Sequence, residues 1–183
     1  MATYISILRG INVSGKNMIK MTDLKKVYED LNFKNVLTYL QSGNVIFNAR
    51  TKDEKALENT IPSAIKKVFD LEVPVMVLTP GNLEEIINGN PFIHDSKWDT
   101  SFLHVTFLAK EPAQYDKERI LNKRLAGEEV AFSSRVVYLY CPNGYGKTNL
   151  NNNFLERQLK VTATTRNWKT TTALLQLAEE AGK

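Results

Sequence analysis

Cysteine and histidine are nearly absent from this sequence, and long apolar runs are missing altogether. The 183 residues include one cysteine and two histidines. One cysteine permits no internal disulfide, and so small a set cannot build the Cys/His cluster of structural zinc. No segment approaches the roughly 18 apolar residues of a membrane helix. The first ten residues are interrupted too soon by polar groups to form a signal peptide. These absences predict a cytoplasmic protein without a metal, a cofactor or a membrane partner.

Charge is mild overall but uneven along the chain. The net charge is +4, with 43% apolar and 24% charged residues, which is the composition of a soluble globular protein. Residues 1–50 carry seven Lys/Arg against three Asp/Glu, and residues 144–183 carry six against three. The middle, 51–143, carries eleven against fourteen. Basic ends favour an anionic partner, although a solvated surface with a chance asymmetry explains them equally well.

Hydrophobic spacing in the first half predicts the element order β-α-β-β-α-β. Thr22 is the expected cap of the first helix, and Pro62 either kinks the second helix or lies in its first turn. Pro74 favours an edge position for the last strand. The expected strands are 4–8, 36–40, 45–47 and 73–78, and the expected helices lie within 22–31 and 57–69.

The same order returns in the second half, although no residue-level repeat accompanies it. Expected strands lie at 102–108, 130–132, 136–140 and 161–164, with helices around 120–125 and 154–159 and a last helix over about 167–181. This pattern predicts an α+β fold of two tandem ferredoxin-like (βαββαβ) subdomains with antiparallel sheets and a C-terminal helix. The predicted boundaries are 1–80 for the first subdomain, 81–100 for a helix and linker, and 101–183 for the second subdomain.

One stretch, LYCPNGYGKTNL, nearly matches the phosphate-binding loop of nucleotide-hydrolysing enzymes. Cys141 stands where the pattern needs glycine, and Pro142 has no N–H to offer a phosphate. No predicted strand ends in an aspartate that would hold Mg²⁺. The preferred interpretation is a glycine turn before a helix capped by Thr148 or Asn149. A weaker anion site formed by Lys147 and the start of that helix is the alternative.

Two loops of the first half concentrate basic and amide side chains. In a split βαβ arrangement, the loop after the first strand and the hairpin between the second and third strands lie at the same end. RGINVSGKN and QSGN should therefore be neighbours, with convergent polar groups at a concave end. An ordinary connection that satisfies its own backbone is the competing interpretation. The candidate ligand-binding residues are Arg9, Asn12, Lys16, Asn17, Gln41, Ser42 and Asn44.

The second half brings a similar set to one end of its predicted sheet. NGYGKTN should lie near TRNW, which groups Lys147, Asn149, Arg166, Asn167 and Trp168 as further candidates. Arg166 has the planar donor fork that clamps phosphate or carboxylate. Trp168 either stacks on a base or ring or belongs to the core. His104 is expected to be a core histidine, and Cys141 is expected to be inert.

Four segments in the same order resemble one bacterial family. They are LRGINV at 8–13, GKN at 15–17, YLQSGNV at 39–45 and TTRNW at 164–168. The chain is similar over nearly its whole length to the family known as domain of unknown function 1697. The resemblance implies a cytoplasmic bacterial protein with two ferredoxin-like subdomains. It implies no activity, because no established function comes with the family.

The residues favour a binding protein for an anionic ligand, either a nucleotide-like small molecule or single-stranded nucleic acid. An enzyme of transferase or hydrolase type at the same cluster is a second hypothesis, although no general base is evident. A protein-interaction domain without a small ligand is the third. The sequence does not fix the oligomeric state.

Overall fold

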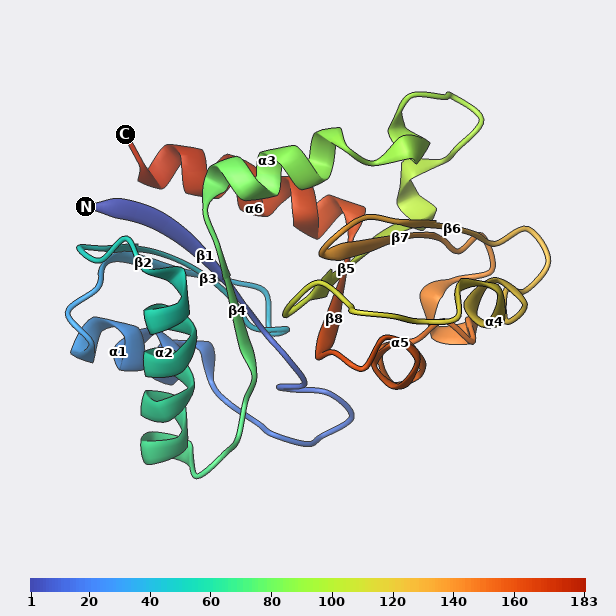
Figure 1. Ribbon diagram of the computed structural model, residues 1–183. Helices are drawn as coiled ribbons and strands as arrows, with labels where there is room; N and C mark the ends of the chain where they lie inside the picture. The colour runs from blue at the N-terminus through green and yellow to red at the C-terminus, as the bar shows by residue number, and fades with distance from the viewer. The chain divides into compact units, whose positions relative to one another are not determined.

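The computed structural model describes residues 1–183 and shows a mixed α+β fold with two four-stranded antiparallel sheets. The chain forms two compact units (Figure 1). Unit 1 is Met1–Glu85 together with Ala173–Lys183, and unit 2 is Ile86–Thr172. The unit boundaries fall inside two helices, α3 (Pro80–Asn88) and α6 (Trp168–Ala181).

Unit 1 contains the first sheet, in which every neighbouring pair of strands is antiparallel. The strand order across the sheet is β2-β3-β1-β4. β4 lies at an edge, as Pro74 predicts, but it begins directly after this proline instead of at residue 73. The strands are β1 (Ala2–Leu8), β2 (Lys34–Tyr39), β3 (Asn44–Ala49) and β4 (Val75–Leu78), and the helices between them are α1 (Met21–Asp30) and α2 (Glu54–Phe69).

The helix starts of unit 1 differ in how they are capped. Asp53 caps α2, because its side chain accepts a hydrogen bond from the N–H of Ala56 at 3.1 Å. α1 begins at Met21 after Lys20, which makes no side-chain cap, so the expectation that Thr22 caps this helix is wrong. Pro62 lies in the interior of α2 rather than in its first turn.

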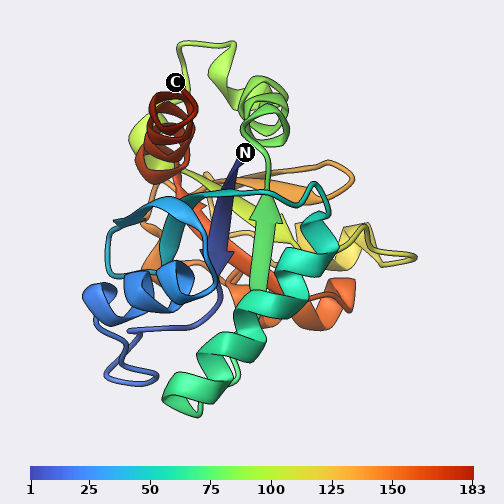
Figure 2. The ribbon, with the colours of Figure 1, turned by 90° about the vertical axis from the view of Figure 1, so that its left-hand side faces the viewer.

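Both faces of the first sheet are covered. On β1, Tyr4 and Leu8 belong to the core beneath α1 and α2, while Ile5 and Ile7 alternate onto the opposite face and are also buried. Figure 2 shows the first part of α3 and the last part of α6 along that opposite face. β1 is therefore buried on both faces from Tyr4 to Leu8.

The last part of α6 belongs to unit 1, whereas the sequence pattern assigned all of 101–183 to the second subdomain. Its end is fixed to the first sheet, because the Asn48 side-chain amide donates to the Ala181 carbonyl at 3.2 Å. A Cβ on Gly182 would lie 3.3 Å from Thr3 Oγ1, so the helix end and β1 approach closely.

Unit 2 repeats the arrangement with a thinner helix layer. Its strand order is β6-β7-β5-β8, again with antiparallel neighbours. The strands are β5 (Leu103–Leu108), β6 (Glu129–Phe132), β7 (Val136–Tyr140) and β8 (Ala163–Asn167), and the helices are α4 (Lys117–Leu121) and α5 (Asn152–Leu159).

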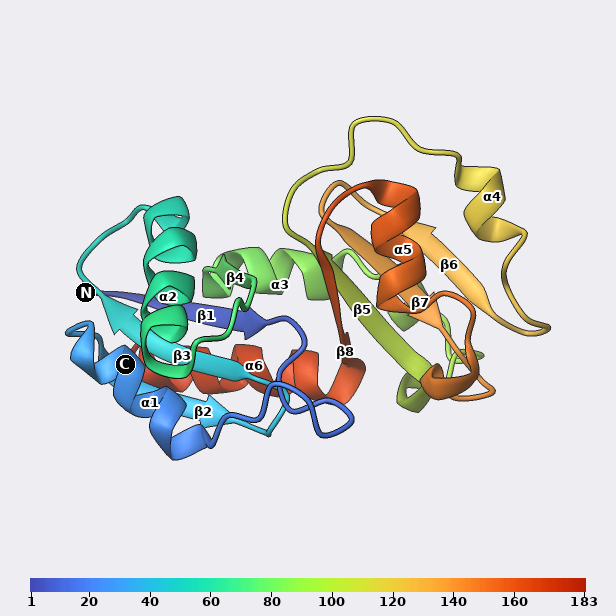
Figure 3. The same cartoon turned by 90° about the horizontal axis from the view of Figure 1, so that it is seen from below.

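The helices of unit 2 are short and lie apart. Ile120 of α4 and Phe154 and Leu155 of α5 enter one core with Leu108 of β5, so both helices cover the same face of the sheet. Figure 3 shows α4 beside β6 at the outer edge and α5 nearer β8. α4 has only five residues, and α5 has eight. The helix layer therefore covers this face of the sheet incompletely.

The predicted linker contains two short helical turns rather than a single loop. These are η1 (Pro91–Ile93) and η2 (Thr100–Phe102). Asn90 and Asp99 cap them through hydrogen bonds from the N–H groups of Phe92 and Ser101.

Candidate functional site

The two predicted loops of unit 1 are neighbours, as the topology predicts. The Asn12 side-chain amide donates to the Gln41 carbonyl at 2.8 Å. The N–H of Leu8 donates to the Gly43 carbonyl, also at 2.8 Å. Ile11 packs so closely on Gly43 that a Cβ there would lie 2.6 Å from Ile11 Cδ1. We call residues 9–20 and 40–44 the loop cluster.

The asparagines of the loop cluster bond its own backbone. Asn12 also donates to the Ile19 carbonyl and accepts from the Ile19 N–H, at 2.9 and 2.8 Å. The Asn17 amide donates to the Gly10 carbonyl, and the Asn44 amide donates to the Tyr39 carbonyl. These side chains have a structural role, which is the competing interpretation that the sequence left open for the loop.

A tight turn fixes the tip of the loop cluster. Ser14 and Gly15 both have positive φ, at 50° and 73°, and the Lys16 N–H donates to the Val13 carbonyl at 2.9 Å. Lys16 and Gln41 are exposed, whereas Arg9 and Ser42 are partly buried. Lys16, Asn17 and Gln41 are thus the predicted ligand-binding residues of the loop cluster that are exposed to solvent.

The second predicted set, which runs from Lys147 to Trp168, lies only in part as the sequence predicts. Tyr145–Lys147 is a 3₁₀ turn, and α5 is capped by Asn151, whose Oδ1 accepts from the Phe154 N–H at 3.0 Å. The expectation that Thr148 or Asn149 caps this helix is therefore wrong. Because α5 starts after Asn151, Lys147 does not lie at its first turn, which removes the basis of the proposed anion site there.

Arg166 and Asn167 are held by their neighbours. The Arg166 guanidinium is buried and donates through Nη1 to Thr164 Oγ1 and to the Thr165 carbonyl, both at 3.0 Å. Asn167 Oδ1 accepts from the Thr170 N–H at 2.8 Å and so caps the start of α6. Trp168 is half-buried.

The loop after β7 and the end of β8 do share one end of the sheet, as predicted. β5 pairs Leu103 with Tyr140 and His104 with Asn167. The ring of Tyr145, from the loop after β7, stacks on His104 with centroids 4.9 Å apart. Burial lowers the pKa of His104, so this imidazole is neutral near pH 7.

A polar groove lies on the helix side of unit 2, between α4 and α5. Its volume is about 1920 Å³. One wall is the segment 113–123, which includes α4, and the other is formed by residues 149–160, which include α5. Tyr115 and Phe154 supply aromatic rings to its lining. We call this concavity the basic groove, because its charged side chains are Arg119, Lys123, Arg157, Lys160, Asp116 and Glu156.

The cations of the basic groove are unpaired. None of the side chains of Arg119, Lys123, Arg157 and Lys160 makes a hydrogen bond or ion pair. Ion pairs do occur elsewhere: Lys66 Nζ lies 2.8 Å from Asp70 Oδ1, and Arg124 Nη1 lies 2.7 Å from Glu129 Oε2. The four cations outnumber the two carboxylates of the groove, and a concave surface with an excess of positive charge concentrates anions.

Both carboxylates of the basic groove are engaged with backbone. Asp116 caps α4 by accepting from the Arg119 N–H at 3.0 Å. Glu156 Oε1 accepts from the Ala163 N–H at 2.9 Å. Each of the two carboxylates therefore already accepts one backbone hydrogen bond.

Asn149 is the member of the predicted set that lines the groove. Its amide donates to the Lys123 carbonyl at 3.2 Å, which ties the two walls together at one end. The four cations were missed by sequence reasoning. Arg119 and Arg157 lie within α4 and α5, whereas Lys123 and Lys160 follow the ends of these helices. Helical spacing therefore does not group the four cations, and nothing in the sequence joined the two helices.

Two further features limit the chemistry of the chain. No group of three or more His, Cys, Asp or Glu side chains is arranged to hold a metal ion. Cys141 is buried, and burial, with the nearby charge of Glu128, raises the pKa of its thiol to about 12.

None of the helices has the length and apolar character needed to cross a bilayer.

The structure is thus that of a mixed α+β protein with two four-stranded antiparallel sheets, a C-terminal helix and a groove whose cations are unpaired. The chain belongs to the family described as protein of unknown function DUF1697, whose model matches residues 1–138. Its fold is similar to that of the conserved bacterial protein SP0830 from Streptococcus pneumoniae. That similarity has a TM-score of 0.70 at 21% sequence identity and covers 96% of this chain and 98% of the other. No curated protein matches the sequence.

Proposed function

We propose that this protein binds an anionic ligand in the basic groove of unit 2. The observation that carries the proposal is the set of four cationic side chains that face a concavity without ion-pair partners. For an unpaired Arg or Lys side chain, replacing bound water with an anion costs little free energy. A cation that is already paired must first give up its partner. Asn149 adds an amide from the predicted set to the same surface.

Binding fits the groove better than catalysis does. A hydrolase or transferase needs a general base or a nucleophile within reach of the bound substrate. Asp116 and Glu156 are the carboxylates present, and both accept backbone hydrogen bonds. The remaining side chains would position a ligand and neutralise its charge. We therefore favour a binding protein over an enzyme.

The finer features of the fold belong to the same proposal. We infer that each unit is a ferredoxin-like subdomain, which the strand orders β2-β3-β1-β4 and β6-β7-β5-β8 support. A cytoplasmic location fits a chain whose single cysteine forms no disulfide. Lys16 and Gln41 of the loop cluster stay a separate prediction for ligand contact.

A thermal-shift experiment with tripolyphosphate tests anion binding without assuming a ligand class. A ligand at about 100 times its dissociation constant stabilises the native state by roughly 2.7 kcal/mol. For a chain of this size the melting temperature would rise by about 5–10 °C. The rise should disappear in the pair Lys123→Gln and Arg157→Gln, which removes one cation from each wall.

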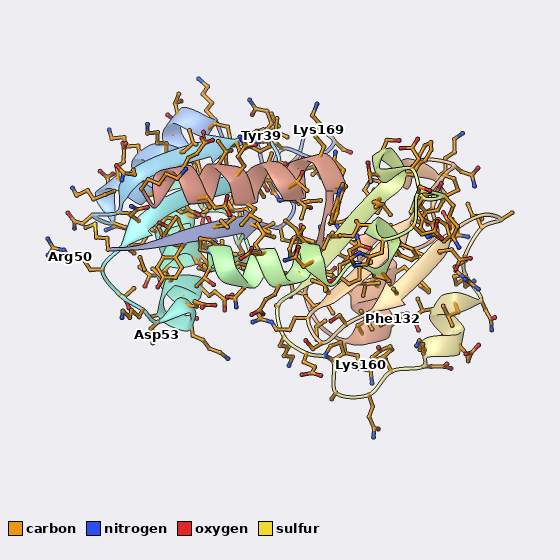
Figure 4. The ribbon with its side chains drawn as sticks, turned by 90° about the horizontal axis from the view of Figure 1, so that it is seen from above. Tyr39, Arg50, Asp53, Phe132, Lys160 and Lys169 are labelled. Carbon is orange, nitrogen blue, oxygen red and sulfur yellow. The ribbon has the colours of Figure 1, made fainter.

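The matched control pair is Arg50→Gln and Lys55→Gln, which removes the same charge from unit 1. Both residues are exposed and unpaired, and Figure 4 shows Arg50 extending away from unit 1. This control should keep the full temperature rise. A rise of equal size in wild type and both pairs would locate binding outside the groove and contradict the proposal.

Exposed apolar side chains favour partner binding as a second function. Met18, Val13 and Leu40, all in the loop cluster, are 67%, 57% and 53% exposed. A photo-crosslinking residue at position 18 should capture a discrete partner from a bacterial lysate. The control is position 68, where Val68 is 58% exposed on α2. Equal capture at the two positions would count against a specific surface.

A further inference from the structure

We propose that the ligand of the basic groove is single-stranded nucleic acid. This inference rests on the proposed function and narrows it to one ligand class. The first argument is size. Pockets for small molecules occupy about 300–1000 Å³, whereas this groove measures about 1920 Å³. A nucleotide or phosphorylated metabolite would fill a fraction of it, whereas a short polymer fills it.

The second argument is how the cations are distributed. Arg119 and Lys123 lie on the α4 wall, and Arg157 and Lys160 lie on the α5 wall. Four cations divided between two chain segments suit several phosphates along one path, because a strand meets cations in succession. Two of the four are arginines, whose planar donors bind phosphate oxygens bidentately.

The third argument is the uncharged lining. Gln114 and Gln158 each offer an amide donor and an amide acceptor, which suits the edges of unpaired bases. Tyr115 lines the groove while its ring packs on Phe132, with centroids 5.6 Å apart. That contact holds the ring in a fixed orientation, and an aromatic face accepts any base by stacking. Phe154 is largely buried and forms part of the floor.

These features favour a single strand over duplex DNA or an acidic peptide. A protein reads duplex DNA by placing a helix or ribbon into a groove about 12 Å wide. Here the cations line a concavity instead of a protruding element. An acidic peptide would use the cations but neither the amides nor the aromatic ring. An unpaired strand uses all three kinds of side chain.

Fluorescence anisotropy with labelled oligothymidylates of 2, 4, 8 and 12 nucleotides tests the inference. Affinity should rise at least tenfold from the dinucleotide to the octanucleotide and change little beyond it, since sites of this kind hold about 4–16 nucleotides. If three or four phosphates are neutralised, the slope of log K against log salt concentration should be about −2 to −3. The Lys123→Gln and Arg157→Gln pair should weaken binding at least tenfold, and the Arg50→Gln and Lys55→Gln pair should not.

The outcomes separate this inference from the proposed function. If tripolyphosphate or thymidine triphosphate binds in the groove as tightly as the octanucleotide, the ligand-class inference fails and anion binding stands. Competition by poly-glutamate as strong as that by the octanucleotide would also overturn it, because charge alone would then suffice. If no anion binds, both proposals fail.

Discussion

The Asn149 side chain donates a hydrogen bond of 3.2 Å to the backbone carbonyl of Lys123. This contact joins the residues before α5 to those after α4, and both lie in the lining of the basic groove. α4 has only five residues, so its position depends on contacts of this kind more than on its own helical hydrogen bonds. The spacing of the two walls is thus set partly by one exposed amide.

Replacing Asn149 with alanine should loosen the groove with little effect on folding. We expect a loss of about 0.5–1.5 kcal/mol in the free energy of unfolding, which is the value of one hydrogen bond. A comparable loss in binding energy is an affinity reduction of about two- to tenfold for the octanucleotide. Urea unfolding and anisotropy titrations measure the two effects separately.

Asn143 provides the control for Asn149. Its amide donates to the Ala126 carbonyl at 3.1 Å, and it does not line the groove. Asn143→Ala should cost similar stability and leave affinity unchanged. Equal affinity losses in the two variants would show that Asn149 acts only through global stability.

Gly43 should tolerate no side chain. Its φ is +82°, and a Cβ would lie 2.6 Å from Ile11 Cδ1 and 2.9 Å from Leu8 Cβ. Gly43→Ala should therefore lower the free energy of unfolding by about 2–5 kcal/mol, which combines backbone strain with overpacking. Gly15 has a φ of +73° and no atom within 4 Å of such a Cβ, so Gly15→Ala should cost only about 1–2 kcal/mol. A smaller loss at Gly43 than at Gly15, measured by urea unfolding, would contradict the close packing of the loop cluster.

Asn12 should matter more to stability than Asn17, although both have positive φ. Asn12 makes three side-chain hydrogen bonds, to Ile19 and Gln41, whereas the Asn17 amide makes one, to Gly10. We expect a loss of about 2–4 kcal/mol for Asn12→Ala and about 1–2 kcal/mol for Asn17→Ala. Guanidinium unfolding of the two variants tests this order, and equal losses would contradict the structural role of Asn12.

Cys141 should be unreactive in the native protein. Its buried thiol has a pKa raised to about 12, whereas an unfolded cysteine titrates near 8.5. The unfolded state therefore binds fewer protons above about pH 8.5, so the contribution of this group to stability falls as pH rises towards 12. At pH 8, alkylation by iodoacetamide should be at least about 100-fold slower in buffer than in denaturing urea. Similar rates would show that the thiol is accessible.

Sequence patterns predict the elements of this fold well because each depends on local spacing. Pro74 marks an edge strand, and the loops around Asn12 and Gln41 meet because strand connectivity requires it. The role of Asn12 was not predictable in the same way. Whether its amide bonds a ligand or its own backbone depends on a positive φ that the residue type permits but does not impose.

The basic groove was beyond sequence reasoning for a different reason. Arg119 and Arg157 lie on helices separated by a hairpin, and their proximity depends on how α4 and α5 pack on one sheet. The place of the exposed Lys160 in the groove was not predictable either. Lys160 follows α5 as its left-handed C-cap, with φ of 54°, so a residue that ends a helix also lines the groove.

The most direct test of the anion-binding groove is an amide NMR titration of the uniformly ¹⁵N-labelled protein with the unlabelled octanucleotide. We predict saturable chemical-shift changes concentrated in residues 113–123 and 149–160, with the tripolyphosphate titration moving a subset of the same amides. Residues 9–20 and 40–44 should change little. Changes centred on the loop cluster, or none that saturate, would contradict the assignment of the ligand site to the basic groove.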